Sequence, residues 1–168
     1  MAISKSKEST IGVSSIIPFL TILFLIIIMM LPYKISVIGD IMPFLTLIGV
    51  YYWSVFRARR LPIWTVFILG MLQDILLGSP IGMMSLLLIV VQQIIFIQGR
   101  QFLERDFIFN WVVFVMLAFG FGVASWGIAS LYIREILDFW NVLGQVLMTI
   151  AFYPVITLLL GLTRKYVK

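Results

Sequence analysis

The chain has 168 residues, of which 62% are hydrophobic and only 11% are charged, and its formal net charge is +5. Soluble domains average about 45–50% apolar and about 25% charged residues, and a soluble chain this short could not hide so much apolar surface from water. The composition therefore excludes an ordinary soluble enzyme, a disordered tail and a basic nucleic-acid-binding groove. With a mean hydropathy of +1.16, it predicts a chain whose main solvent is lipid.

The chain contains no cysteine and no histidine. Their absence excludes disulfides, thiolate nucleophiles, cysteine zinc sites, hydrolytic triads with a histidine base and HExxH metalloprotease motifs. Asp and Glu are the remaining ligands for hard metals, and they are scattered along the sequence. We therefore expect no metal, no cofactor and no enzymatic activity.

Six apolar stretches approach the length of about 20 residues that a transmembrane helix needs. They span residues 15–31, 41–56, 61–77, 81–97, 108–131 and 141–163. Helix breakers and charges separate them, and each stretch is apolar at both odd and even positions, unlike a strand of a membrane barrel. The sequence predicts an all-α fold: a single membrane domain over residues 1–168, built as a bundle of six transmembrane helices.

Basic residues divide unevenly between the two sides of this predicted bundle. With the N-terminus in the cytoplasm, ten of the twelve Lys and Arg residues fall on the cytoplasmic side, and only Lys34 and Arg134 lie outside. Because Lys and Arg accumulate in cytoplasmic loops, we expect a multi-pass membrane protein with both termini in the cytoplasm.

The segment from Gly70 to Gly82, which begins in the third stretch, carries the most distinctive pattern, because Gly70, Asp74, Gly78 and Gly82 recur every four residues. Residues at this spacing share one face of a helix, and small residues there let a neighbouring helix approach closely. These four residues are our candidate packing or partner face. The carboxylate of Asp74 could act as a partner contact or a proton-linked switch. It could also be a buried polar group bonded to a neighbouring helix end or to N–H groups of the turn, which we favour because an acid within the membrane needs a partner first.

Polar residues within the other stretches suggest contacts between helices. Gln92 and Gln93 lie halfway along the fourth stretch, where hydrogen bonds to other helices would satisfy their amides. The fifth stretch contains many small residues and is predicted to pack closely inside the bundle, the other possibility being a subunit interface.

Aromatic and basic residues mark the predicted cytoplasmic boundary. Tyr51, Tyr52 and Trp53 end the second stretch and Trp64 opens the third, as in the aromatic belts found at membrane surfaces. The basic residues between these stretches are interpreted as topology anchors near anionic lipid or as a candidate cytoplasmic surface for a partner. They are Arg57, Arg59 and Arg60.

The segment from residue 42 to residue 82 resembles the rod shape-determining protein MreD family of bacteria. The resemblance rests on Met42-Pro43-Phe44, on Tyr52-Trp53, on Arg60-Leu61-Pro62, and on the pattern Phe67, Gly70, Asp74, Gly78 and Gly82. Tyr153-Pro154 and the basic C-terminal tail are similar to the family as well.

This resemblance implies a multi-pass protein of the bacterial cytoplasmic (inner) membrane. It also implies a non-enzymatic scaffold in the machinery that builds the lateral cell wall, with no family active site to transfer. It implies direct binding to the single-span protein MreC. Through MreC, it implies links to actin-like MreB, a RodA-type glycan polymerase and a class B penicillin-binding transpeptidase. No nucleic acid is implied as a partner.

The family is also similar in fold to the S components of energy-coupling-factor transporters, so the alternative is a subunit that captures a vitamin-like solute. S components dock through an Ala-x-x-x-Ala motif on the first helix, whereas residues 15–31 contain no alanine. A scaffold is therefore favoured.

Overall fold

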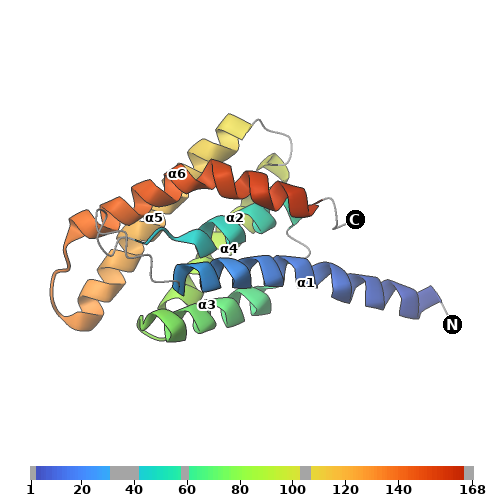
Figure 1. The fold of residues 1–168 in the computed structure, drawn as a ribbon, viewed down its shortest axis with the longest axis horizontal. Helices are drawn as coiled ribbons and strands as arrows, with labels where there is room; N and C mark the ends of the chain where they lie inside the picture. Colours follow the sequence, from blue (N-terminus) through green and yellow to red (C-terminus); the bar gives the residue numbers. More distant parts are fainter. Residues whose placement is uncertain (1–2, 31–41, 58–60, 103–106, 165–168) are drawn as a thin grey trace.

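In the computed structural model the chain forms six α-helices (Figure 1). The structure describes residues 3–30, 42–57, 61–102 and 107–164, and these contain no strand. The helices are α1 (Ile3–Met30), α2 (Leu45–Arg57), α3 (Ile63–Leu77), α4 (Met83–Phe102), α5 (Phe107–Ile133) and α6 (Phe139–Arg164). The predicted all-α class is confirmed, and each predicted stretch overlaps one helix, although α1 begins well before the predicted residue 15 and α4 ends after the predicted residue 97.

The helices differ in whether they are long enough to cross a bilayer. Among the described residues, α5 and α6 contain apolar stretches of sufficient length, 108–133 and 139–162, with mean hydropathies of 2.1 and 2.0. The apolar stretches of three other helices are shorter, and they cover Ile16–Met30, Ile63–Leu77 and Met83–Gln98. Length and composition therefore support two membrane-spanning helices directly.

Helix α2 begins later than the sequence predicts, at Leu45 instead of residue 41. Residues 42–44 lie outside the helix, because Pro43 lacks an N–H group and restricts the residue before it to extended conformations. The Phe44 N–H donates instead to the Thr149 Oγ1 of α6, at 2.8 Å. With 13 residues, α2 is only about 20 Å long, shorter than the hydrocarbon core of about 30 Å.

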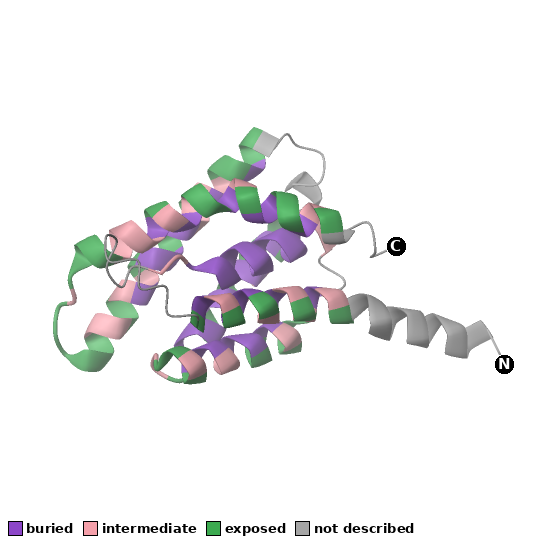
Figure 2. Ribbon diagram, in the orientation of Figure 1, coloured by how far each residue is buried: buried purple, intermediate pink, exposed green. Residues whose placement is uncertain are grey.

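Helix α2 is the centre of the bundle. Every residue from Leu45 to Val55 is buried, and Figure 2 shows this helix as an almost unbroken buried segment. It packs against α1, α4 and α6, and its Gly49 leaves just enough room for the side chains of Ile22 and Leu25 on α1. The short helix is therefore enclosed by protein, and the longer helices form the outside.

The predicted aromatic belt is wrong for three of its residues, because Tyr51, Tyr52 and Trp53 lie in the core. The Tyr51 hydroxyl donates to the backbone oxygen of Asn110 at 2.8 Å, and the Trp53 Nε1 donates to Thr21 Oγ1 at 2.9 Å. Buried Tyr and Trp commonly find such partners for their polar ends. Trp64, by contrast, is 76% exposed at the start of α3, as the belt interpretation requires.

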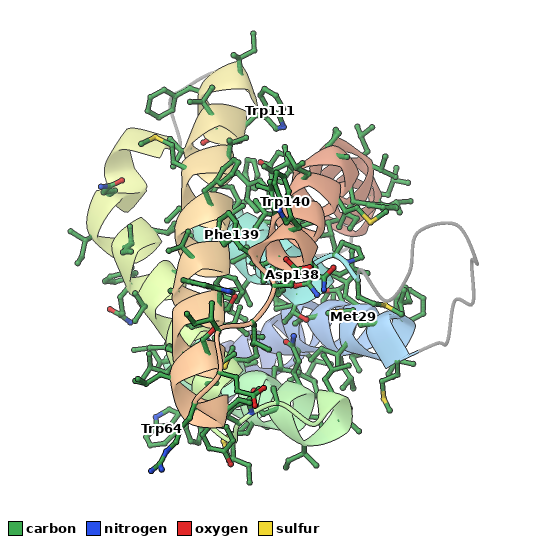
Figure 3. The ribbon with its side chains drawn as sticks, turned by 90° about the vertical axis from the view of Figure 1, so that its left-hand side faces the viewer. Met29, Trp64, Trp111, Asp138, Phe139 and Trp140 are labelled. Carbon is green, nitrogen blue, oxygen red and sulfur yellow. The ribbon has the colours of Figure 1, made fainter. Side chains whose placement is uncertain are left out.

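Helices α5 and α6 form a hairpin whose turn is held by aromatic and polar contacts. The ring of Trp126 meets that of Phe139 edge-on, and its Nε1 donates to the Leu137 backbone oxygen. Asp138 accepts the Trp140 N–H at 3.1 Å and so caps α6 (Figure 3). The prediction that the small residues of α5 pack closely holds for Gly122, which is packed against Val146, whereas a Cβ atom at Gly120 or Gly127 would meet nothing within 4 Å.

The central position of Trp53 predicts a large difference between two tryptophan variants. Trp53→Ala should lower the free energy of unfolding by about 3 kcal/mol, because it removes a fully packed ring and leaves a cavity. Trp64→Ala, the matched exposed control, should change it by less than about 0.5 kcal/mol. Unfolding of the purified protein in mixed micelles measures both, and equal losses would contradict the placement of Trp53.

Candidate functional site

The carboxylate at the end of α3 is the most connected polar group of the candidate face. Asp74 lies one turn before the helix ends, and its backbone oxygen accepts the N–H groups of Gly78 and Ser79. Gly78 follows the helix in the left-handed conformation, with φ of 68°, which glycine adopts without steric penalty. The main chain of Asp74 therefore closes α3.

The side chain of Asp74 begins the next helix. Its Oδ1 accepts the Ser79 hydroxyl at 2.6 Å and the Met84 N–H at 3.1 Å, and its Oδ2 accepts the Gly82 N–H at 2.9 Å. The first N–H groups of a helix have no partner within that helix, and a carboxylate there also interacts favourably with the helix dipole. Asp74 thus caps α4 from the preceding helix and fixes the turn between the two.

Close packing of α3 against α4 starts one turn earlier, at Gly70. A Cβ atom on Gly70 would lie 2.5 Å from the Cα of Ser85, so the two backbones approach as only a glycine allows. The Ser85 hydroxyl also donates to the Phe67 backbone oxygen at 3.3 Å. Gly70 and Asp74 therefore hold the start of α4 against α3 through two successive turns.

The structure separates the four predicted residues into two pairs. Gly70 and Asp74 are buried on α3 and face α4. Gly78 and Gly82 belong to the turn, both with positive φ, and a Cβ atom on either would meet nothing within 4 Å. The last two glycines thus serve the backbone conformation of the turn, and the four residues do not form one continuous helix face.

The surroundings of Asp74 suit a structural clamp. The carboxylate is fully buried, and three hydrogen bonds occupy it. Within the described parts of the chain, no group of three or more acidic residues is placed to hold a metal ion. Three hydrogen-bond donors fix the position of the carboxylate. The arrangement therefore keeps the α3–α4 hairpin rigid.

Ser79 is a residue of this site that the sequence analysis missed. Its hydroxyl makes the shortest of the three hydrogen bonds to Asp74. A serine in the Gly-Ser-Pro turn, five residues after an acid, is the signal that could have revealed it, because serine side chains commonly bond within turns.

The remaining polar candidates lie elsewhere. Gln92 is buried on α4, and its Nε2 donates to the Leu61 backbone oxygen at 2.7 Å, which ties α4 to the chain two residues before the start of α3. Arg57 ends α2 and is partly buried, whereas Arg59 and Arg60 lie outside the described residues.

The chain is similar to a known protein family and to a known bacterial protein. The sequence profile of the family described as rod shape-determining protein MreD matches residues 9–163. The chain is also 29% identical, over 139 residues, to an uncharacterized protein of Rickettsia prowazekii (strain Madrid E), covering 83% of this chain and 79% of the relative. No solved structure matches the chain.

The clamp predicts that Asp74→Asn is milder than Asp74→Leu. The asparagine oxygen can still accept hydrogen bonds, so we expect a loss of about 1–2 kcal/mol in the free energy of unfolding. Leucine leaves the Gly82 and Met84 N–H groups and the Ser79 hydroxyl without an acceptor, so its loss should reach about 3 kcal/mol or more.

Unfolding in mixed micelles measures both variants, with Asp138→Leu as the control because Asp138 caps an exposed helix start. That control should lose only about 1 kcal/mol. Equal losses for the asparagine and leucine variants would show that the negative charge is required, and not merely a hydrogen-bond acceptor.

Proposed function

The chain belongs to the rod shape-determining protein MreD family of bacterial membrane proteins, and from this premise we propose that it is a non-enzymatic scaffold of the cell-wall elongation machinery. The match over residues 9–163 is the observation that carries the proposal. The family acts in determining rod shape and is not a known family of enzymes. A scaffold of this kind needs a fixed orientation in the membrane, a rigid body and a surface for its partners.

The proposed scaffold crosses the inner membrane six times, with both termini in the cytoplasm. The asymmetry of the basic residues supports this orientation. In addition, α1 begins and α6 ends on the same side of the molecule (Figure 1), as an even number of crossings requires. The short helix α2 fits this arrangement because it is enclosed by protein, and enclosed backbone does not have to match the thickness of the lipid.

The physical properties of the described residues suit binding within the bilayer. The core is built from large interlocked side chains, and the α3–α4 turn is fixed by Asp74. Large apolar side chains remain exposed on the outer faces of α5 and α6. A rigid body with such faces can hold other transmembrane helices in a fixed position. We therefore propose direct, helix-mediated binding to MreC. Through MreC, the scaffold would be linked to MreB, to a RodA-type glycan polymerase and to a class B penicillin-binding transpeptidase.

The topology is tested by fusing reporters to the chain. Fusions at Lys168 and within residues 100–106 should be active with a reporter that works in the cytoplasm and inactive with one that works in the periplasm, because both sites follow an even number of crossings. A fusion within residues 134–138 should show the opposite pattern. Periplasmic activity at either of the first two sites would overturn the proposed topology.

The function is tested by depletion and by co-purification. Depletion in a rod-shaped host should produce rounded cells, and the detergent-solubilised protein should retain MreC even when MreC is truncated to its transmembrane helix and cytoplasmic tail. Unchanged rod-shaped growth would contradict the scaffold role, and binding that requires the soluble domain of MreC would contradict association through helices. Growth rescued by a vitamin, together with a co-purifying ATPase pair, would support the transporter alternative.

A further inference from the structure

Four buried polar side-chain atoms have no hydrogen-bond partner in the part of the chain that the structure describes. They belong to Ser54, Gln73, Gln92 and Asn110. Most buried polar atoms of a protein bond to other protein groups or to ordered water, so an atom that no described residue satisfies is a place where water can bind. The register of α2 against α5 brings two of the four together, the hydroxyl of Ser54 and the Oδ1 of Asn110.

Two aromatic contacts fix the register between α2 and α5. Phe44, just ahead of α2, meets Phe121 with 5.2 Å between the ring centroids, and Tyr51 meets Phe114 with 5.1 Å. Seven residues forward from Phe44 to Tyr51 thus match seven residues backward from Phe121 to Phe114. The two helices therefore run antiparallel, and pairs of large rings fill the space between them at two successive levels.

Ser54 and Asn110 form the next level of this register. Ser54 comes three residues after Tyr51, and Asn110 comes four residues before Phe114, so the two lie level with each other to within about 1.5 Å. Residues three or four apart share a face of a helix, so both border the space that the rings fill at the other levels. The Tyr51 hydroxyl reaches this level as well, because it donates to the Asn110 backbone oxygen at 2.8 Å. Here a serine and an asparagine, both much smaller than a ring, stand between the helices.

The Ser54 hydroxyl lacks the usual partner of a hydroxyl within a helix. Thr21, Ser125 and Thr157 each donate to a backbone oxygen three or four residues earlier, as Ser and Thr commonly do in helices. Ser54 is only 3% exposed, yet its hydroxyl makes no such bond. Its hydrogen is therefore free to donate into the space between α2 and α5.

We propose that Ser54, Asn110 and Tyr51 hold an ordered water molecule between α2 and α5. The Ser54 hydroxyl donates to the water oxygen. The water donates one hydrogen to Asn110 Oδ1 and the other to the Tyr51 hydroxyl oxygen, which still has an acceptor position while it donates to the Asn110 backbone. Three hydrogen bonds are the usual number for a buried water. The water joins the central helix to the first turns of α5, next to the direct bond from Tyr51.

Radiolytic labelling of the natural chain in micelles tests the water directly. X-rays generate hydroxyl radicals from bound water as well as from bulk water, so a buried ring beside a bound water is oxidised more readily than a buried ring in a dry place. Phe114 is 0% exposed, yet it should be oxidised faster than Phe44 and Phe121, which are 7% and 4% exposed. The difference should be lost in Asn110→Leu. Slower or equal oxidation of Phe114 in the natural chain would overturn the proposal.

The sign of the stability change in Ser54→Ala is a second test. The melting temperature should fall by about 2–4 °C, because the water and the chain lose one hydrogen bond. Ser125→Ala is the matched control, since Ser125 is 4% exposed and bonds only to its own helix, and it should change the melting temperature less.

The other outcomes of these experiments reject the water for different reasons. A higher melting temperature in Ser54→Ala would show that the hydroxyl has no partner, because alanine then removes an uncompensated buried polar group. A lower melting temperature without faster oxidation of Phe114 would show that Ser54 and Asn110 bond directly to each other. Neither measurement depends on the membrane topology or on the proposed role in rod shape.

Discussion

Pairing of backbone N–H groups inside the protein is the constraint on which the rest of this structure depends, because lipid offers them no water. At the start of α4, Asp74 accepts the N–H groups of Gly82 and Met84. Ahead of α2, Thr149 accepts the Phe44 N–H. These helix starts are satisfied by side chains from other helices, so each cap also joins two elements. The same contacts that satisfy the backbone therefore fix the architecture.

This constraint explains how a helix as short as α2 can form the centre. Its neighbours cover it on all sides, and its polar aromatic residues bond to α1 and α5 through Thr21 and Asn110. Tyr51 also packs with its aromatic neighbours, edge-on against Phe114 and Tyr153. A core tied in this way changes shape with difficulty, which is the property that the proposed scaffold role requires.

The two adjacent glutamines of α4 show how one helix can serve both the inside and the outside of the bundle. Successive residues on a helix point about 100° apart, so Gln92 reaches Leu61 in the core whereas Gln93 is partly exposed. The division depends on which side of α4 the neighbouring helices cover.

The sequence by itself determined the class of fold and the number of helices, because hydropathy and helix breakers act locally. It also identified Asp74 as an acid that needs a partner in the membrane. Only the tertiary structure decided what each residue contacts. Tyr51 and Trp53 became core residues because other helices cover α2, and Gly78 and Gly82 became turn residues because α3 ends at Leu77. A periodic pattern specifies which residues share a face, but the neighbours that cover that face come from distant parts of the chain.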